Sequence, residues 1–300
     1  RGFNPVLICL CYIGILFSQN THPIILIHGF LGWGRTEMAG YYYWGGKTDL
    51  ETELKSSGYE VYTVSVGPIS PNWDRAIEAF YQIKGGQVDY GNEKAEKHGI
   101  IQRPAGKNYP GFYPQWDAEH PVHLIGHSQG GSTAKMLEVL LQSSITGEDS
   151  PLLANVYTGW ISSVTTISTP HNGTTLVSLM LDVFPFALNL APWFGGIENE
   201  KIDKLYSFDL EHWNLEKRPN ESIKEYYARI SQSPVGNEKN LCTWDLSIAG
   251  SVEFNNNYHA EKDVYYFSIP TFSTIKKKGK PTHKPDKKMS FHLWPTGMLI

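Results

Sequence analysis

The chain has 300 residues with 26 basic and 30 acidic side chains, so its formal net charge is −4, and 41% of its residues are hydrophobic. This balance is typical of a globular chain and excludes intrinsic disorder, a collagen-like repeat and a multi-span membrane protein. The near-neutral charge argues against nucleic acid as a partner. A domain of this length buries roughly three quarters of its unfolded surface, so no disulfide is needed to hold its core.

Residues 1–20 are predicted to be a cleaved secretory signal. Arg1 precedes an apolar run over residues 6–17 that ends in the polar stretch 18–20, which is the charged, apolar and polar order of an export signal. The run is too short to span a bilayer, so no transmembrane segment is predicted. A buried N-terminal strand or helix is the alternative. Because the first residue is not methionine, the start is expected to be incomplete, and Cys242 would be the single thiol left after cleavage.

From residue 21 onward, short apolar runs alternate with helical patterns. This alternation predicts one α/β domain over residues 21–300, with a mostly parallel sheet and helices on both faces. Each predicted strand is bounded by Gly, Pro or polar residues; the strands are 24–27, 61–64, 122–125, 164–167 and 264–267. Helices are predicted between them, among them 49–56 and 132–142.

Two long segments interrupt this pattern. Residues 71–121 are rich in glycine and aromatic residues and are predicted to form an inserted lobe between the second and third strands. The apolar residues of 174–196 cover every side of any helix they form, and such a helix must be buried or used against an apolar surface. Residues 276–288 hold seven lysines, which favours a solvated loop over a patch for lipid headgroups. Asn172 and Asn220 lie in N-x-[ST] sequons, which accept glycans only in a eukaryotic host.

The stretch GHSQG, residues 126–130, follows the third predicted strand and precedes an amphipathic helix. This context is what a nucleophile elbow requires, and it makes Ser128 the candidate nucleophile. Glycines flank the serine because only residues without a Cβ let helix and strand approach closely. Residues 28–30 end the first strand, where an α/β-hydrolase places its oxyanion loop, and the backbone N–H groups of Phe30 and Gln129 are the candidate donors. The alternative is a glycine-rich turn in a structural βαβ unit.

A serine hydroxyl is a poor nucleophile until a histidine takes its proton, and a carboxylate must hold that histidine in the right tautomer. In this fold the chain order is serine, acid, histidine. No further strand is predicted after residue 267. The in-chain completion is therefore Asp263 or Asp286 with His292, although a lone late histidine is more often a surface residue.

Several collinear stretches between about residues 22 and 267 resemble one known family: PIILIHGFLGWGRTEMAGYYYWGG, VGPISPNWDRAIEAFYQIKGGQVDYG, HLIGHSQGGSTAKML, SVTTISTPHNGTTL and WDLSIAGSVEFN. They are similar to the secreted lipases of the staphylococcal and thermoalkalophilic bacillus type. The resemblance implies an α/β-hydrolase that cleaves triacylglycerol esters, with Ser128 as nucleophile and the backbone of Phe30 and Gln129 as oxyanion donors. It also implies that residues 174–196 are a lid that opens at an oil surface.

The chain departs from that family's pattern in the triad. In the family, the acid and the histidine lie in segments resembling a W-L-x-N-D-G turn and a D-H-L-E stretch, and neither occurs before Ile300. Both triad residues are therefore expected beyond Ile300, and the chain is interpreted as incomplete at its C-terminus. The family's calcium ligands fall mostly in the same segment, so calcium binding is predicted neither way.

A second departure concerns zinc. The resemblance implies a tetrahedral zinc site of two aspartates and two histidines, and Asp74 and Asp245 match the aspartates, but Lys94 and Ile100 stand at the histidine positions. An ammonium and an alkyl group offer no lone pair, so no zinc is predicted. Lys94 is expected to lie between Asp74 and Asp245 as an ion pair that replaces the charge of the metal, with His98 as a further positive group.

The favoured function is a secreted serine esterase that acts on long-chain acylglycerols at an oil–water interface, without a cofactor. A carboxylesterase or phospholipase on the same fold is the enzymatic rival, and the apolar segment argues against it. A lipase-derived protein that binds lipid or a partner without turnover is the alternative from another class. The absence of the triad histidine favours that alternative, whereas the intact elbow argues for an active parent.

Overall fold

The computed structural model describes residues 20–175, 206–222, 239–280 and 282–289, together with Val177 and six isolated positions between 225 and 233. The predicted signal and nearly all of the predicted lid therefore lie outside the described residues, and so does His292. Among the helices that are described, none is long and apolar enough to cross a membrane.

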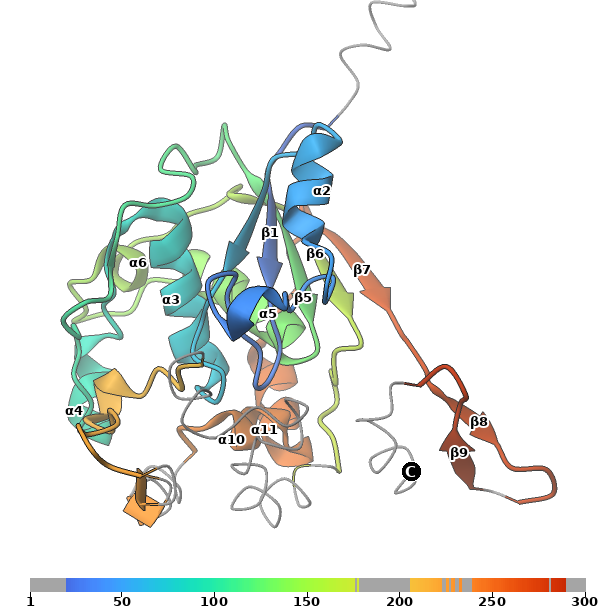
Figure 1. Ribbon diagram of the computed structural model, residues 1–300. Helices are drawn as coiled ribbons and strands as arrows, with labels where there is room; N and C mark the ends of the chain where they lie inside the picture. Colours follow the sequence, from blue (N-terminus) through green and yellow to red (C-terminus); the bar gives the residue numbers. More distant parts are fainter. Residues whose placement is uncertain are drawn as a thin grey trace, which may run out of the picture.

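A five-stranded sheet in the order β2-β1-β5-β6-β7 forms the centre of the molecule (Figure 1). Its strands are β1 Ile24–Ile27, β2 Val61–Val64, β5 Val122–His127, β6 Ile161–Ile167 and β7 Tyr265–Ile269. Every pairing between them is parallel. The predicted α/β fold with its five strands is thus confirmed.

Strand β6 begins earlier than the hydrophobic pattern predicts, because polar residues lie in its first half. The hydroxyl of Ser162 lies 2.7 Å from Nδ1 of His22, and that of Ser163 lies 2.7 Å from Nδ1 of His123 on β5. Polar strand residues that find hydrogen-bond partners cost little to bury. A pattern based on apolar runs does not detect them.

Helices flank the sheet (Figure 1). The helices and 3-10 turns are η1 Met38–Gly40, α2 Leu50–Ser56, α3 Asn72–Lys84, α4 Asn92–His98, α5 Gln129–Leu141, α6 Pro151–Ala154, η2 Glu211–Trp213, α10 Cys242–Leu246 and α11 Ile248–Asn257. Helix α2 begins at Leu50 because the side chain of Asp49 accepts the Thr52 N–H at 3.2 Å, a typical N-cap. Helices α3 and α5 pack against each other, and α5 also contacts β1, β5 and β6.

The segment 71–121, predicted as an inserted lobe, begins with a helix of the main fold. Helix α3 packs on α5, and its Ile77 is fully buried in the core. The part of the segment that stands apart from the sheet follows Lys84 and contains α4 and a short antiparallel pair, β3 Gly86–Gln87 with β4 Asn108–Tyr109. The lobe is therefore smaller than the composition of the segment indicates.

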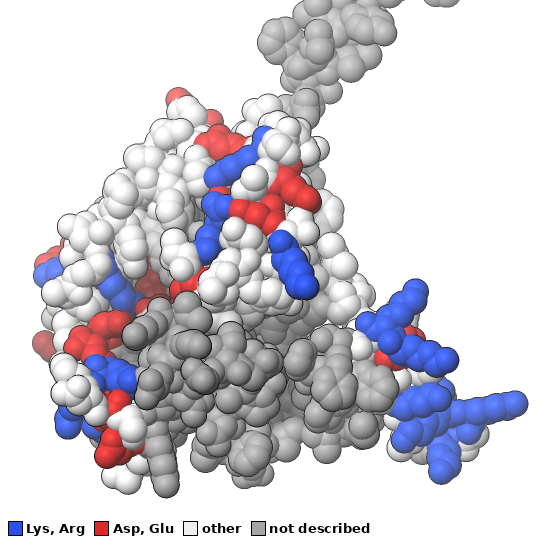
Figure 2. Space-filling view, viewed as in Figure 1, with Lys and Arg blue, Asp and Glu red and all other residues white. Residues whose placement is uncertain are grey.

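The lysine-rich segment 276–288 was predicted to be a loop, and most of its described residues are turn or irregular, but Lys276 and His283–Pro285 belong to a β-hairpin. Strand β8 Thr274–Lys276 pairs antiparallel with β9 His283–Pro285, and Gly279 takes a φ of 72° in the turn between them. The lysines of this segment are exposed to solvent, as predicted. They form the blue arm at the right of Figure 2. Charged side chains are tolerated in such a strand because both of its faces meet water.

Candidate active site

Ser128 lies in the turn between β5 and α5 with a φ of 55° and a ψ of −125°. This backbone conformation is costly for a residue with a Cβ and persists only where the surroundings enforce it. The Ser128 N–H donates to the carbonyl of Ile167 on β6 at 2.8 Å. Within the described residues, the Ser128 hydroxyl has no hydrogen-bond partner, and the residue is half-buried. The hydroxyl is therefore held at the carboxyl edge of the sheet and available for reaction.

The two glycines of the GHSQG motif are required by the close approach of the chain. A Cβ on Gly126 would lie 2.3 Å from the carbonyl carbon of Gly130, and a Cβ on Gly130 would lie 2.1 Å from the carbonyl oxygen of Ile27. Real Cβ atoms do not approach other atoms so closely, so any side chain at either position would move the strand or the helix. The strand, turn and helix predicted for the nucleophile are present.

The loop that follows β1 lies directly against the serine. A Cβ added to Gly29 would be 2.8 Å from the Cβ of Ser128. Phe30 is the next residue of this loop, and Gln129 is the first residue of α5. Within the described residues, neither backbone N–H has a hydrogen-bond partner. Unpaired N–H groups beside a half-buried serine are what stabilisation of an oxyanion requires.

Arg75 on α3 fastens this loop to helix α5. Its guanidinium donates to the carbonyl of His28, to the carbonyl of Gly67 at 2.7 Å and to the hydroxyl of Thr133 on α5 at 2.9 Å. Burial lowers the pKa of Arg75 to about 10, which leaves it charged at neutral pH. Sequence reasoning missed Arg75, because an arginine in an amphipathic helix is usually exposed.

Tyr43 adds a second bridge between the loop and the nucleophile strand. Its hydroxyl accepts the Gly29 N–H at 2.9 Å and lies 2.5 Å from Nδ1 of His127. Burial raises the pKa of Tyr43 to about 12, so the hydroxyl keeps its proton at neutral pH. In the sequence, Tyr43 belongs to the aromatic run YYYW. This run supported the family resemblance but did not single out Tyr43.

The structure does not bring the in-chain acid candidates to Ser128. Asp263 is exposed and precedes β7, and in a parallel sheet that position lies at the edge opposite to the end of β5. Asp286 lies at the end of the β8-β9 hairpin, where its carboxylate accepts the Lys288 N–H at 2.8 Å. At the carboxyl end of β7, residues 270–272 are Pro, Thr and Phe, and none carries a carboxylate.

Asp74 and Lys94, which sequence reasoning paired, are in contact. The Lys94 ammonium forms an ion pair with Oδ1 of Asp74. Burial opposes the ionisation of Asp74, but Lys94 and the imidazole of His212 hold its pKa below its usual value. Nε2 of His212 lies 3.2 Å from Oδ2 of Asp74. His212 is thus a further group beside Asp74, and it was missed because 138 residues separate the two along the chain.

Asp245, the other aspartate that matches the family's zinc site, accepts a hydrogen bond from the backbone. Its Oδ2 accepts the N–H of Asn72, which opens α3. Burial raises the pKa of Asp245 to about 6, and the charge of Lys94 acts in the opposite direction. Ile100 is 8% exposed and packs within the hydrophobic core. The positions that the resemblance assigns to zinc ligands thus hold a salt bridge and a packed alkyl side chain.

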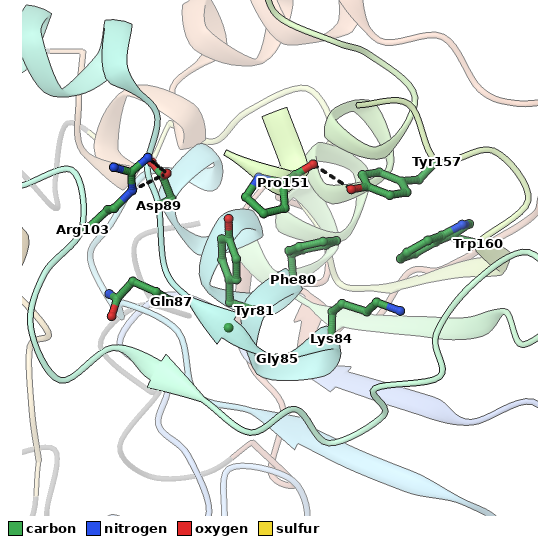
Figure 3. A pocket seen from close by; sticks show the side chains of 11 residues that line it. Phe80, Tyr81, Lys84, Gly85, Gln87, Asp89, Arg103, Pro151, Tyr157 and Trp160 are labelled. Atoms are coloured by element: carbon green, nitrogen blue, oxygen red, sulfur yellow. Dashed lines mark hydrogen bonds and ion pairs between the residues drawn. The ribbon is translucent and has the colours of Figure 1, made fainter. Parts of the chain in front are cut away.

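A separate cavity of about 300 Å³ lies near the amino ends of the strands. Aromatic rings and an ion pair line it (Figure 3), among them Phe80, Tyr81, Tyr157, Trp160 and the Arg103–Asp89 pair. Trp160 directly precedes β6, whereas Ser128 follows the end of β5. The cavity and the nucleophile are therefore at opposite edges of the sheet.

A parallel sheet with a strained serine between its central strand and the following helix, and unpaired amides beside that serine, defines the α/β-hydrolase class. The family model described as "Lipase-like, C-terminal domain" matches residues 20–300. The chain belongs to this lipase-like family.

Relatives with names and structures agree with this assignment. The chain is 35% identical over 298 residues to Lipase 1 of Staphylococcus aureus (strain NCTC 8325 / PS 47), covering 94% of this chain and 43% of the relative. It thus spans less than half the length of that curated relative. EstA from Clostridium botulinum superposes with a TM-score of 0.85 at 38% identity, covering 95% of this chain and 69% of that one. Staphylococcus hyicus lipase gives a TM-score of 0.77 at 31% identity, covering 94% and 74%.

Proposed function

We propose that the protein hydrolyses carboxylic esters, with long-chain triacylglycerols as its substrate class, through an acyl-enzyme on Ser128. The observation that carries this proposal is the strained serine beside the unpaired N–H groups of Phe30 and Gln129. The names of its relatives, Lipase 1 and Staphylococcus hyicus lipase, support an enzyme over a lipid-binding protein without turnover.

The chemistry follows from these positions. Oγ of Ser128 attacks the ester carbonyl carbon while a histidine base takes the hydroxyl proton. The carbonyl oxygen becomes an oxyanion, which the N–H groups of Phe30 and Gln129 stabilise. The bond to the leaving alkoxide breaks, and the histidine returns the proton to that oxygen. Water then attacks the acyl-enzyme by the same route, which releases the fatty acid and restores Ser128.

We place the histidine base and its acid beyond Ile300. Support comes from β7, whose Tyr265, Phe267 and Ile269 are 73%, 55% and 47% exposed. Parallel strands are normally covered on both faces, so among the described residues this strand lacks the cover that a further strand and helix would provide. An intact mass of the native protein that exceeds this chain by roughly a hundred residues is the expected result, given the usual size of such a domain. A mass equal to or below that of this chain contradicts the placement.

We further propose that the enzyme is exported and acts at an oil–water interface. The order of charged, apolar and polar residues in segment 1–20 supports export. The β8-β9 hairpin follows the carboxyl end of β7, so its lysines project from the same edge of the sheet as Ser128. A basic arm that follows this edge of the sheet suits a surface that becomes negative as fatty acids are released.

The test is Ser128→Ala in the native protein, with Ser132→Ala on the following helix α5 as the matched control. We expect S128A to lower kcat on trioleoylglycerol emulsions by roughly 10³-fold or more and to abolish the mass adduct of a serine-reactive phosphonate. S132A should keep both activity and adduct. Hydrolysis that survives in S128A would disprove the role of Ser128, and faster turnover of phosphatidylcholine vesicles than of the emulsion would assign the site to a phospholipase.

A further inference from the structure

A junction of ionisable side chains connects four elements of the described structure. Asp74 lies on α3, Lys94 on α4, His212 on η2 and Asp245 on α10. Asp74 and His212 are fully buried, and the Lys94 side chain is 11% exposed. Figure 1 shows α4 and the orange η2 segment side by side, and the Ile101 N–H donates to the carbonyl of His212 at 2.7 Å.

These residues do not fit the zinc ion that the family resemblance implies. The ammonium of Lys94 is in contact with the Asp74 oxygen that a metal would need, and Ile100 offers no donor atom. In the part of the chain that the structure describes, no group of three or more His, Cys, Asp or Glu side chains is placed to hold a metal ion.

We propose that the Lys94 ammonium is a built-in cation that takes the place of a metal ion at this junction, so that the fold around it is independent of bound metal. A fully buried carboxylate such as Asp74 is costly unless opposite charge and hydrogen bonds compensate it. Lys94 supplies the charge to Oδ1, and His212 supplies a hydrogen bond to Oδ2. A cation that is covalently part of the chain cannot be removed by a chelator.

The junction also holds the segment that returns to the candidate active site. His212 belongs to a stretch in which the Tyr206 hydroxyl donates to the carbonyl of Gly32 at 3.4 Å. In the same stretch, the Ser207 N–H donates to Oε1 of Glu37 at 3.2 Å. Gly32 and Glu37 lie in the loop that follows β1. Through Asp74 and His212, Lys94 therefore fastens the stretch that packs on this loop.

The first measurement is metal analysis of the purified native protein, combined with thermal unfolding in the presence and absence of EDTA and of added ZnCl₂. We expect less than a tenth of an equivalent of zinc per chain and the same Tm in all three conditions. One equivalent of zinc together with a Tm that falls in EDTA would overturn the proposal.

The second measurement removes the charge. Lys94→Met should lower Tm by about 5–10 °C, because it leaves the Asp74 carboxylate buried without its cation. Lys97→Met, on the exposed side of the same helix, is the control and should change Tm by less than about 2 °C. The double variant K94M/D74N removes both charges and should recover much of the loss, which also tests the pair if K94M alone does not fold. Equal stability of K94M and K97M would disprove the role of Lys94.

Discussion

At the residue scale, His28 shows how one neutral ring holds the loop beside Ser128. The Val66 N–H donates to Nε2 of His28 at 3.1 Å, so the ring proton lies on Nδ1, which donates to the carbonyl of Gly29 at 2.9 Å. Burial, with the positive charge of Arg75, lowers the pKa of His28 to about 3. Protonation of Nε2 would place its hydrogen against that of the Val66 N–H, so the hydrogen bond with Val66 would break.

This depressed pKa predicts a loss of stability in acid. A histidine with a folded-state pKa near 3 contributes stability that is fully present above its unfolded pKa of 6.5, and this contribution falls with pH below that value. Between pH 6.5 and pH 5 the loss should be about 2 kcal/mol. Urea unfolding of the wild type and of His28→Gln across this range measures the difference. If the free energy of unfolding of the two proteins falls equally with pH, His28 is not responsible for the loss of stability in acid.

At the element scale, Glu138 connects the edge of the sheet to helix α5. It lies on α5 and is fully buried. The Tyr258 hydroxyl, at the end of α11, donates to its Oε2 at 2.6 Å, and the Tyr266 hydroxyl on β7 donates to its Oε1. One carboxylate therefore positions both α11 and β7 relative to α5, although most of β7 is exposed.

Removal of one of these hydroxyls tests the bridge. Tyr258→Phe should lower the free energy of unfolding by about 1–2 kcal/mol, because a hydrogen bond to a buried carboxylate is lost. Tyr59→Phe, at an exposed tyrosine, should change it by less than about 0.5 kcal/mol. Chemical denaturation of the two variants gives the comparison. Equal effects would mean that the bridge to Glu138 contributes nothing.

At the scale of the whole molecule, charge is distributed unevenly. The segment 276–288 holds seven lysines in a chain whose net charge is −4. The rest of the chain therefore carries a larger negative net charge. Figure 2 shows these lysines on an arm apart from the body, and the hairpin strands contact mainly each other. The arm thus carries a local positive field on a negative protein.

This separation predicts salt-sensitive binding to anionic lipid. Lys277→Gln with Lys278→Gln should weaken binding to vesicles that contain phosphatidylglycerol by about thirtyfold, since each lysine near such a surface contributes about 1 kcal/mol. Lys47→Gln with Lys97→Gln removes the same charge from the body and is the control. Co-sedimentation at low and high salt measures both pairs, and an equal reduction by the control pair would exclude a special role for the hairpin.

Local features of the site could be predicted from the sequence. The elbow at Ser128 and the loop at Phe30 follow directly after predicted strands, and the glycines around them mark close approach of backbone. Such features depend on neighbours in the chain, so an apolar run followed by glycines is enough to place them. The five strands of the sheet were predictable for the same reason, apart from the ends where serines bond to histidines.

The sequence by itself determined the α/β class, the candidate nucleophile and the contact between Lys94 and Asp74, because a motif or a family resemblance carried each of them. Only the tertiary structure decided that His212 meets Asp74 across 138 residues, that Arg75 reaches His28, and that Asp263 lies at the edge opposite to Ser128. These outcomes depend on the order and direction of strands in the sheet. Packing sets that order, and it brings together side chains whose separation along the chain carries no signal.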